Sequence, residues 1–140
     1  MNLFRLPFYL QLTAYSCSAA VYQTVVRALT GKHISHYQAM RDVRCTRSGT
    51  DDKDLKKALR EHGLRIRTVG RKVVKFNAVL DEGGVVVTSD METYDEPHCI
   101  CVCGRIGRWW IVNDPARAAR LAYPKELVGQ ADGAYAVTLK

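Results

Sequence analysis

The sequence predicts a domain of the α+β class, in which a helical half precedes a mainly antiparallel β half. Apolar residues recur with helical spacing as far as Gly63, and from Leu64 onward they mostly alternate with polar residues. The length of 140 residues is that of one domain, with a helical lobe expected over about 1–63 and a β lobe over about 64–140. Hydrophobic residues make up 47% of the chain, which excludes a disordered protein.

Three helices are expected in the first half. The first runs from Cys17 to Leu29, where apolar residues recur about four positions apart, and Gly31 follows it as a helix stop. Ser35 opens the second helix as an N-cap, and Thr50 opens the third, whose first turn is rich in aspartate. The residues expected to face the core are Val21, Val25 and Leu29 in the first helix, Tyr37, Met40 and Val43 in the second, and Leu55, Ala58 and Leu59 in the third.

Strands are expected to dominate the second half. The turn at Gly104–Gly107 joins two apolar runs and predicts a hairpin. The segment Val73–Leu80 fits a helix or a strand equally well. The expected strands are Leu64–Val69, Val85–Thr88, His98–Val102, Trp109–Val112 and Gly133–Leu139.

The chain is basic. Lys and Arg number 21 and Asp and Glu number 14, which gives a net charge of +7 and favours an anionic partner such as an acidic peptide. The basic residues are dispersed and lack interleaved stacking aromatics, so we expect no nucleic-acid binding. No apolar run approaches the roughly 18–20 residues of a membrane-spanning helix, and we recognise no signal peptide, so a soluble, cytoplasmic protein is expected.

Three of the five cysteines alternate along one predicted strand, as Cys99, Cys101 and Cys103. Alternation places the three thiols on one face, and neighbours on a single strand are poorly placed to form a disulfide. Buried free thiols in a reducing compartment are the favoured interpretation. A thiolate metal cluster is the alternative, although the paired Cys-x-x-Cys spacing of metal ligands is missing. We therefore expect neither a metal nor a cofactor.

Four residues are candidates for nucleophilic chemistry. Cys17 begins the first helix, where free backbone N–H groups and the helix dipole favour a thiolate. His98 opens one strand and Asp114 follows the next, so an imidazole and a carboxylate can meet there to transfer a proton and to orient the ring. Gln11, six residues before Cys17, carries an amide that can stabilise an oxyanion. Taken singly, each residue type is more often structural, and their joint placement indicates the site. The other imidazoles lie near helix ends and are expected at the surface: His33, His36 and His62.

The segments that carry these residues resemble a known family. Residues 11–20, Gln-Leu-Thr-Ala-Tyr-Ser-Cys-Ser-Ala-Ala, are similar to the N-terminal motif of the bacteriocin-processing, double-glycine leader cysteine peptidases and their free-standing, papain-like relatives. The likeness continues at Gly49-Thr50, over residues 55–64, from His98 to Gly104, and at residues 112–115, Val-Asn-Asp-Pro. It spans roughly residues 6–139. The resemblance implies a papain-like fold, with an N-terminal helical lobe packed on the β-sheet.

The resemblance also implies roles for the candidates. Cys17 would be the nucleophile, His98 the base, Asp114 the orienting residue and Gln11 the oxyanion donor of a thiol hydrolase that cleaves a peptide or amide bond through an acyl-enzyme. Asn113 is an alternative orienting residue, because papain itself uses an asparagine. The sequence departs from the family pattern after the nucleophile and after the histidine, where Ser18 replaces the more common glycine and Cys99 a bulky residue.

Other functions remain open at this point. A deamidase or an acyl transferase would use the same four residues, because the thioester intermediate is shared. A catalytically silent, peptidase-like module would bind an acidic peptide on its basic surface. A metal-binding protein would use the three alternating cysteines. The substrate or partner expected for the leading hypothesis is a peptide or a protein.

Overall fold

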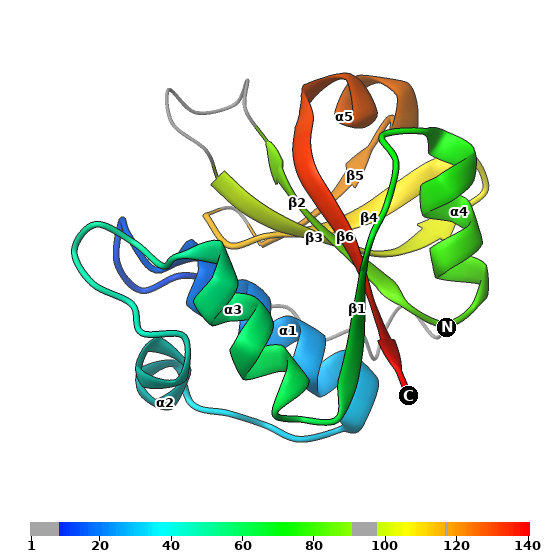
Figure 1. The fold of residues 1–140 in the computed structure, drawn as a ribbon. Helices are drawn as coiled ribbons and strands as arrows, with labels where there is room; N and C mark the ends of the chain where they lie inside the picture. The colour runs from blue at the N-terminus through cyan, green and yellow to red at the C-terminus, as the bar shows by residue number, and fades with distance from the viewer. Residues whose placement is uncertain (1–8, 91–97, 117) are drawn as a thin grey trace.

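The computed structural model describes residues 9–90, 98–116 and 118–140. Over these residues the chain forms five helices and a six-stranded sheet, which confirms the predicted α+β class (Figure 1). The helices are α1 (Cys17–Thr30), α2 (His36–Asp42), α3 (Asp52–Arg60), α4 (Val73–Asp81) and α5 (Pro124–Gln130). The strands are β1 (Leu64–Thr68), β2 (Val85–Asp90), β3 (His98–Ile106), β4 (Trp109–Asp114), β5 (Ala118–Ala122) and β6 (Ala131–Leu139).

The sheet separates two layers of helices. Its strands lie in the order β1-β6-β2-β3-β4-β5, and each is antiparallel to its neighbours. On one face α1 and α3 share a buried apolar cluster with Val87 and Val137, and on the other α4 and α5 pack around Phe76 and Trp110. Within the described part of the chain, no helix is long and apolar enough to cross a membrane.

The first helix is buried more completely than an amphipathic stripe requires. All residues from Ala19 to Val26 are buried, because α1 packs against the sheet on one side and against α2 and α3 on the other. Gly31 ends the helix as predicted, with φ of +78° and its N–H donating to the carbonyl of Arg27. Helix α1 packs against β3 and β4, the strands that carry His98 and Asp114.

The second helix corrects one predicted core residue. Ser35 caps α2 as expected, and its hydroxyl accepts from the N–H of Gln38 at 3.2 Å. Tyr37, however, is 73% exposed, and the inward face of this short helix is formed by Ala39 and Val43. Residues two positions apart lie on opposite sides of a helix, so the burial of Ala39 turns Tyr37 toward solvent.

The β half contains two elements that the sequence analysis did not predict, β5 and α5. The sequence of β5, Ala-Ala-Arg-Leu-Ala, lacks β-branched residues, and the segment forms a strand because it pairs with β4 at the edge of the sheet. The ambiguous segment Val73–Leu80 is helical, with Phe76 and Val79 buried three positions apart. The predicted hairpin strands extend further than expected, as far as Ile106 and Asp114.

The alternating cysteines lie on the α1-facing side of β3, as the alternation predicts. Cys101 and Cys103 are buried, with their sulfurs 3.6 Å apart, and Cys99 is partly exposed. Within residues 9–90, 98–116 and 118–140, no three His, Cys, Asp or Glu side chains are grouped as a metal site requires. All five cysteines are free thiols.

Candidate active site

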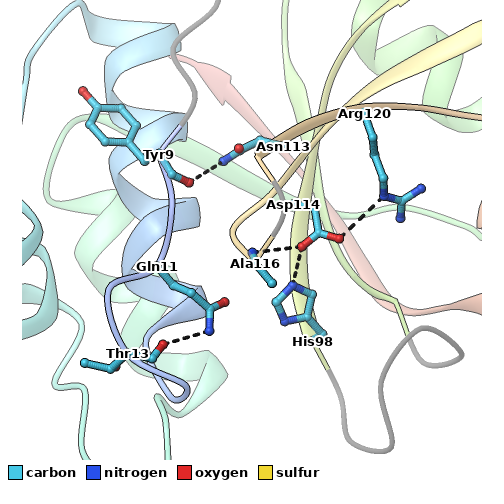
Figure 2. A network of polar contacts seen from close by, with 8 residues as sticks. All are labelled: Tyr9, Gln11, Thr13, His98, Asn113, Asp114, Ala116 and Arg120. Atoms are coloured by element: carbon cyan, nitrogen blue, oxygen red, sulfur yellow. Dashed lines mark hydrogen bonds and ion pairs between the residues drawn. The ribbon is translucent and has the colours of Figure 1, made fainter.

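Cys17, His98 and Asp114 come from three different elements. Cys17 is the first residue of α1, His98 the first of β3 and Asp114 the last of β4. Because β3 and β4 are antiparallel neighbours, the beginning of one lies beside the end of the other. Figure 2 shows His98 and Asp114 side by side at this end of the two strands.

The imidazole of His98 is held by a buried carboxylate. His98 Nε2 lies 2.7 Å from Asp114 Oδ1, which also accepts from the N–H of Ala116 at 3.1 Å, and Arg120 Nε lies 3.6 Å from Oδ2. Asp114 is fully buried and His98 is 6% exposed. Burial raises the pKa of Asp114, but the bonds from His98 and Ala116 and the charges of His98 and Arg120 lower it overall. The carboxylate therefore stays ionised beside the ring.

The thiol of Cys17 interacts with the same imidazole. It also interacts with the backbone N–H of Cys99, and both interactions lower its pKa. Burial raises the pKa of Cys17, but these interactions and the charge of His98 lower it overall. Burial lowers the pKa of His98, and its bonds with Asp114 and Cys17 raise it to about 9. The lowered pKa of the thiol and the raised pKa of the imidazole favour the thiolate–imidazolium pair over the neutral pair.

Gln11 lies in the loop that precedes α1. Its backbone N–H donates to the carbonyl of Pro115 at 2.8 Å, which ties this loop to the segment that follows Asp114. Its side-chain Nε2 donates to the carbonyl of Thr13 at 2.8 Å and keeps a second hydrogen, while Oε1 is buried without a partner among the described residues (Figure 2). The N–H of Cys17, in the first turn of α1, has no acceptor within the helix. Gln11 Nε2 and the N–H of Cys17 are therefore the two candidate donors for an oxyanion.

Asn113, the alternative orienting residue, faces away from His98. Its Nδ2 donates to Thr24 Oγ1 at 2.6 Å and lies 3.5 Å from the carbonyl of Tyr9. Neighbouring residues of a strand point to opposite faces, so Asn113 is directed at α1 while Asp114 is directed at the imidazole. Asn113 links β4 to α1 and to the segment before it.

Ser18, one of the two departures from the family pattern, acts on two neighbouring thiols. Its hydroxyl lowers the pKa of both Cys17 and Cys99. The pKa of Cys17 is lowered overall, whereas Cys99 keeps a pKa well above the ordinary value because its sulfur is buried. A glycine has no hydroxyl and could not act in this way.

The sequence analysis missed a polar network behind the loop of Gln11. His36, predicted to lie at the surface, is partly buried and contacts Ser16, the N-cap of α1, and Gln23. No local pattern signals these contacts, because His36 lies twenty positions from Ser16 and the two meet only through the packing of α2 on α1.

Two cavities lie at opposite ends of the sheet. A cavity of about 310 Å³ is lined by Asp52 and Lys56 of α3 and by Tyr135 of β6, among others. It lies at the same end of the strands as His98. The beginning of β6 pairs with the end of β2, which in turn pairs with the beginning of β3. A cavity of about 270 Å³ lies at the other end, beside the β3–β4 turn, and includes Arg105 and Trp110 in its lining.

Solved structures of peptidases have the same fold. The peptidase domain of Streptococcus ComA, a transporter involved in quorum sensing, matches with a TM-score of 0.76 and 15% identity, over 97% of this chain and all of that one. A double-glycine-motif protease from an AMS/PCAT transporter, in complex with a leader peptide, matches with a TM-score of 0.74 and 20% identity, over 96% and 90% of the two chains. A C39-like peptidase from Bacillus anthracis matches with a TM-score of 0.68 and 12% identity, over 99% and 96%.

No curated protein sequence matches the chain. The model of the Peptidase C39 family matches residues 5–132, which include all four candidate residues. Nearly the whole chain is covered, and the papain-like arrangement of helices and antiparallel sheet agrees with it. The chain belongs to the Peptidase C39 family of bacteriocin-processing, papain-like peptidases and is a cysteine peptidase.

Proposed function

We propose that the peptidase uses Cys17 as nucleophile, His98 as general base and acid, Asp114 as the orienting residue and Gln11 as an oxyanion donor. The observation that carries the proposal is the 2.7 Å bond between Asp114 and His98, together with the lowered pKa of Cys17 and the raised pKa of His98, each of which has the other residue among its causes. These residues come from both halves of the chain, which supports one domain over 1–140 rather than two independent lobes.

The chemistry follows from the ionised pair. The Cys17 thiolate attacks the carbonyl carbon, and the resulting oxyanion accepts hydrogen bonds from Gln11 Nε2 and from the N–H of Cys17. The carbon–nitrogen bond breaks as His98 Nδ1 donates its proton to the leaving amine, which leaves a thioester on Cys17. A water then attacks the thioester, His98 accepts a proton from it, and release of the acid restores the thiolate and the imidazolium.

Asp114 takes no proton in this cycle. Its carboxylate accepts from His98 Nε2 in every step, which keeps Nδ1 directed at the sulfur. The N–H of Ala116 and the charge of Arg120 stabilise the ionised carboxylate in its buried position. Loss of this carboxylate would leave the ring free to rotate away from Cys17.

The substrate we propose is a peptide with acidic residues. One solved relative is a protease in complex with a leader peptide, and the net charge of +7 favours an anionic ligand. The cavity of about 310 Å³, at the same end of the strands as His98, has Lys56 and Arg71 in its lining. Beside them the buried hydroxyl of Tyr135 has no hydrogen-bond partner among the described residues. Asp52 also lines the cavity and is paired with Lys56 at 2.9 Å. Arg71 and the Tyr135 hydroxyl are therefore the groups there that would meet a carboxylate side chain of the bound peptide.

A peptide-library digest tests this proposal. The native protein, the Cys17→Ala variant and a Cys45→Ala control are incubated with the same library, and the products are sequenced by mass spectrometry. We expect new N-termini, enriched near Asp and Glu, with the native protein and the control and none with Cys17→Ala. High salt should reduce the preference for acidic peptides, because it screens exposed charges.

The products also separate the related activities. Conversion of a side-chain amide to an acid without chain cleavage would identify a deamidase, and joined peptides would identify a transferase. Either result would overturn hydrolysis while retaining Cys17 as nucleophile. Cleavage that survives in Cys17→Ala would overturn the assignment of the nucleophile itself.

A further inference from the structure

We propose that His36 is a positioning residue for the oxyanion site, which it holds through Ser16 and Thr13. The inference rests on the proposed function of Cys17 and Gln11. It starts from a continuous chain of hydrogen bonds that runs from the interior of the helical half to the amide of Gln11. Neither the charge pattern nor the helical periodicity of the sequence indicates this chain.

The first part of the chain determines which nitrogen of His36 carries the hydrogen. Gln23 Nε2 donates to the carbonyl of Ile34 at 2.8 Å, so Gln23 Oε1 faces the other way, toward His36. His36 Nδ1 lies 2.9 Å from this oxygen and must be the donor, because an amide oxygen only accepts. In the neutral ring Nε2 then has a free lone pair. Burial lowers the pKa of His36, which favours this neutral form.

The second part leads from the ring to Gln11. His36 Nε2 lies 3.1 Å from Ser16 Oγ, which accepts from the N–H of Thr13 at 3.1 Å. The Thr13 carbonyl accepts from Gln11 Nε2 at 2.8 Å. The Ser16 hydroxyl can donate its hydrogen either to the Thr13 carbonyl oxygen, which lies 3.2 Å from Oγ, or to His36 Nε2. We assign this hydrogen to His36 Nε2, which lies slightly nearer, at 3.1 Å, and whose lone pair the N–H of Leu12 also approaches at the longer distance of 3.5 Å.

Both proposed oxyanion donors depend on this chain. Ser16 is the N-cap of α1 and directly precedes Cys17, so its position sets the direction of the Cys17 N–H. Thr13 sets the position of the Gln11 amide. Ser16 is fully buried and Gln23 is 3% exposed, so water cannot replace a lost partner easily and a break in the chain leaves buried polar groups unpaired.

Two substitutions of His36 separate positioning from simple packing. His36→Asn keeps an amide nitrogen near the place of Nδ1 and so retains the bond to Gln23, but it loses the acceptor for Ser16. His36→Gln places an amide oxygen near the place of Nε2 and so retains the acceptor for Ser16, but it loses the donor to Gln23. If His36 only anchors α2 to α1, the two variants should be impaired alike.

Two small probes report on different steps. With p-nitrophenyl acetate the Cys17 thiolate attacks the ester carbonyl, p-nitrophenolate leaves with its electron pair, and the acetyl group stays on sulfur after an oxyanion has formed. With iodoacetamide the same thiolate displaces iodide from a saturated carbon, and no oxyanion forms. A loss confined to the ester therefore reports on the oxyanion site, whereas a loss with both probes reports on the thiolate.

We expect His36→Asn to slow acylation by p-nitrophenyl acetate by about tenfold, less than the roughly 100-fold loss of a whole oxyanion donor. Alkylation of Cys17 by iodoacetamide should be unchanged, and His36→Gln should recover most of the acylation rate. In a Gln11→Ala background, His36→Asn should cost far less than it does alone, because both substitutions remove the same stabilisation.

Several outcomes would overturn the inference. Equal losses in His36→Asn and His36→Gln would assign His36 to packing alone, as would full additivity with Gln11→Ala. Equally slowed reaction with both probes would show that His36 acts on the thiolate and not on the oxyanion site. Ser16→Ala breaks the chain at a second place and should repeat the ester-only loss if His36→Asn fails to fold. A native protein whose Cys17 reacts with neither probe faster than the other thiols would overturn the proposed function as well.

Discussion

Cys17 at the start of α1 is partly buried and Cys101 in the middle of β3 is fully buried, and the pKa values of these thiols on neighbouring elements move in opposite directions. The bond with Cys103 raises the pKa of Cys101, burial raises it further, and no cation opposes them. Burial raises the pKa of Cys17 too, but His98 and the N–H of Cys99 outweigh it. The comparison attributes the lowered pKa of Cys17 to an imidazole partner that Cys101 lacks, acting against the burial that raises the pKa of both thiols.

Strand β3 supplies both environments. His98 presents its ring to Cys17, and the adjacent Cys99 presents its backbone N–H, whereas the thiols of β3 face the apolar cluster under α1. The five cysteines thus differ in function because of where α1 begins relative to β3. The predictions below test this contrast between the thiol of α1 and the thiols of β3, from the largest expected effect to the smallest.

Removal of the imidazole should abolish the contrast. In His98→Ala, burial is the main remaining influence on Cys17, so its pKa should rise above the ordinary value. We expect alkylation of Cys17 by iodoacetamide at pH 7 to fall by about 100-fold, since each pKa unit changes the thiolate fraction tenfold. Mass mapping of the alkylated cysteines measures this, with His33→Ala as the control imidazole. A Cys17 that remains the fastest thiol in His98→Ala would contradict the prediction.

Replacement of the carboxylate should weaken the contrast without removing it. Asp114→Asn keeps the shape of the side chain but removes the charge that helps to raise the pKa of His98 to about 9. We expect peptide cleavage to fall by up to about 10⁴-fold, as in a serine-protease triad that loses its orienting carboxylate. NMR titration of the His98 ring should show a lower pKa. An unchanged ring pKa would mean that Asp114 is not its partner in solution.

The pH dependence of peptide cleavage by the native protein should show the titration of both Cys17 and His98. Cleavage should rise with pH as Cys17 loses its proton, at a pH below that of an ordinary thiol, because its pKa is lowered. It should fall as pH passes about 9, because His98 then loses the proton that it donates to the leaving amine. Alkylation by iodoacetamide needs only the thiolate and should not fall there. A cleavage rate that keeps rising above pH 10 would exclude His98 as the acid.

Removal of the Ser18 hydroxyl should raise the pKa of Cys17 slightly. Ser18→Ala deletes one hydrogen bond to the thiolate, worth about 1 kcal/mol. We expect the pKa of Cys17 to rise by less than about one unit and alkylation at pH 6 to slow by about three- to fivefold. Stopped-flow alkylation against pH measures the shift. A larger loss, equal to that of His98→Ala, would show that Ser18 holds the site in place.

Replacement of a β3 thiol should leave the Cys17 reaction unchanged. Cys101→Val keeps most of the buried volume, so unfolding free energy should change by less than about 1.5 kcal/mol. Thermal unfolding measures the stability, and mass mapping measures the alkylation of Cys17. A slower Cys17 with unchanged stability would mean that the thiols of β3 tune the nucleophile, and the contrast would need revision.

Local patterns account for the parts of the fold and site that could be predicted. The helical periodicity of α1 and the stop at Gly31 are visible in neighbouring residues, as are the alternation of β3 and the hairpin that sets His98 near Asp114. Tyr37 was assigned to the wrong face because a seven-residue helix offers too few positions for a periodicity to be distinguished. Strand β5 exists only because β4 pairs with it.

By itself, the sequence determined the order of elements and the residue types at their ends, since propensity, capping and periodicity act over a few neighbouring positions. Tertiary structure alone decided which thiol meets an imidazole and which is merely buried, and it decided that His36 contacts Ser16 across twenty residues. The physical reason is that pKa shifts and buried hydrogen bonds depend on distances between groups that are remote along the chain, and packing of α1 and α2 against each other and the sheet sets those distances.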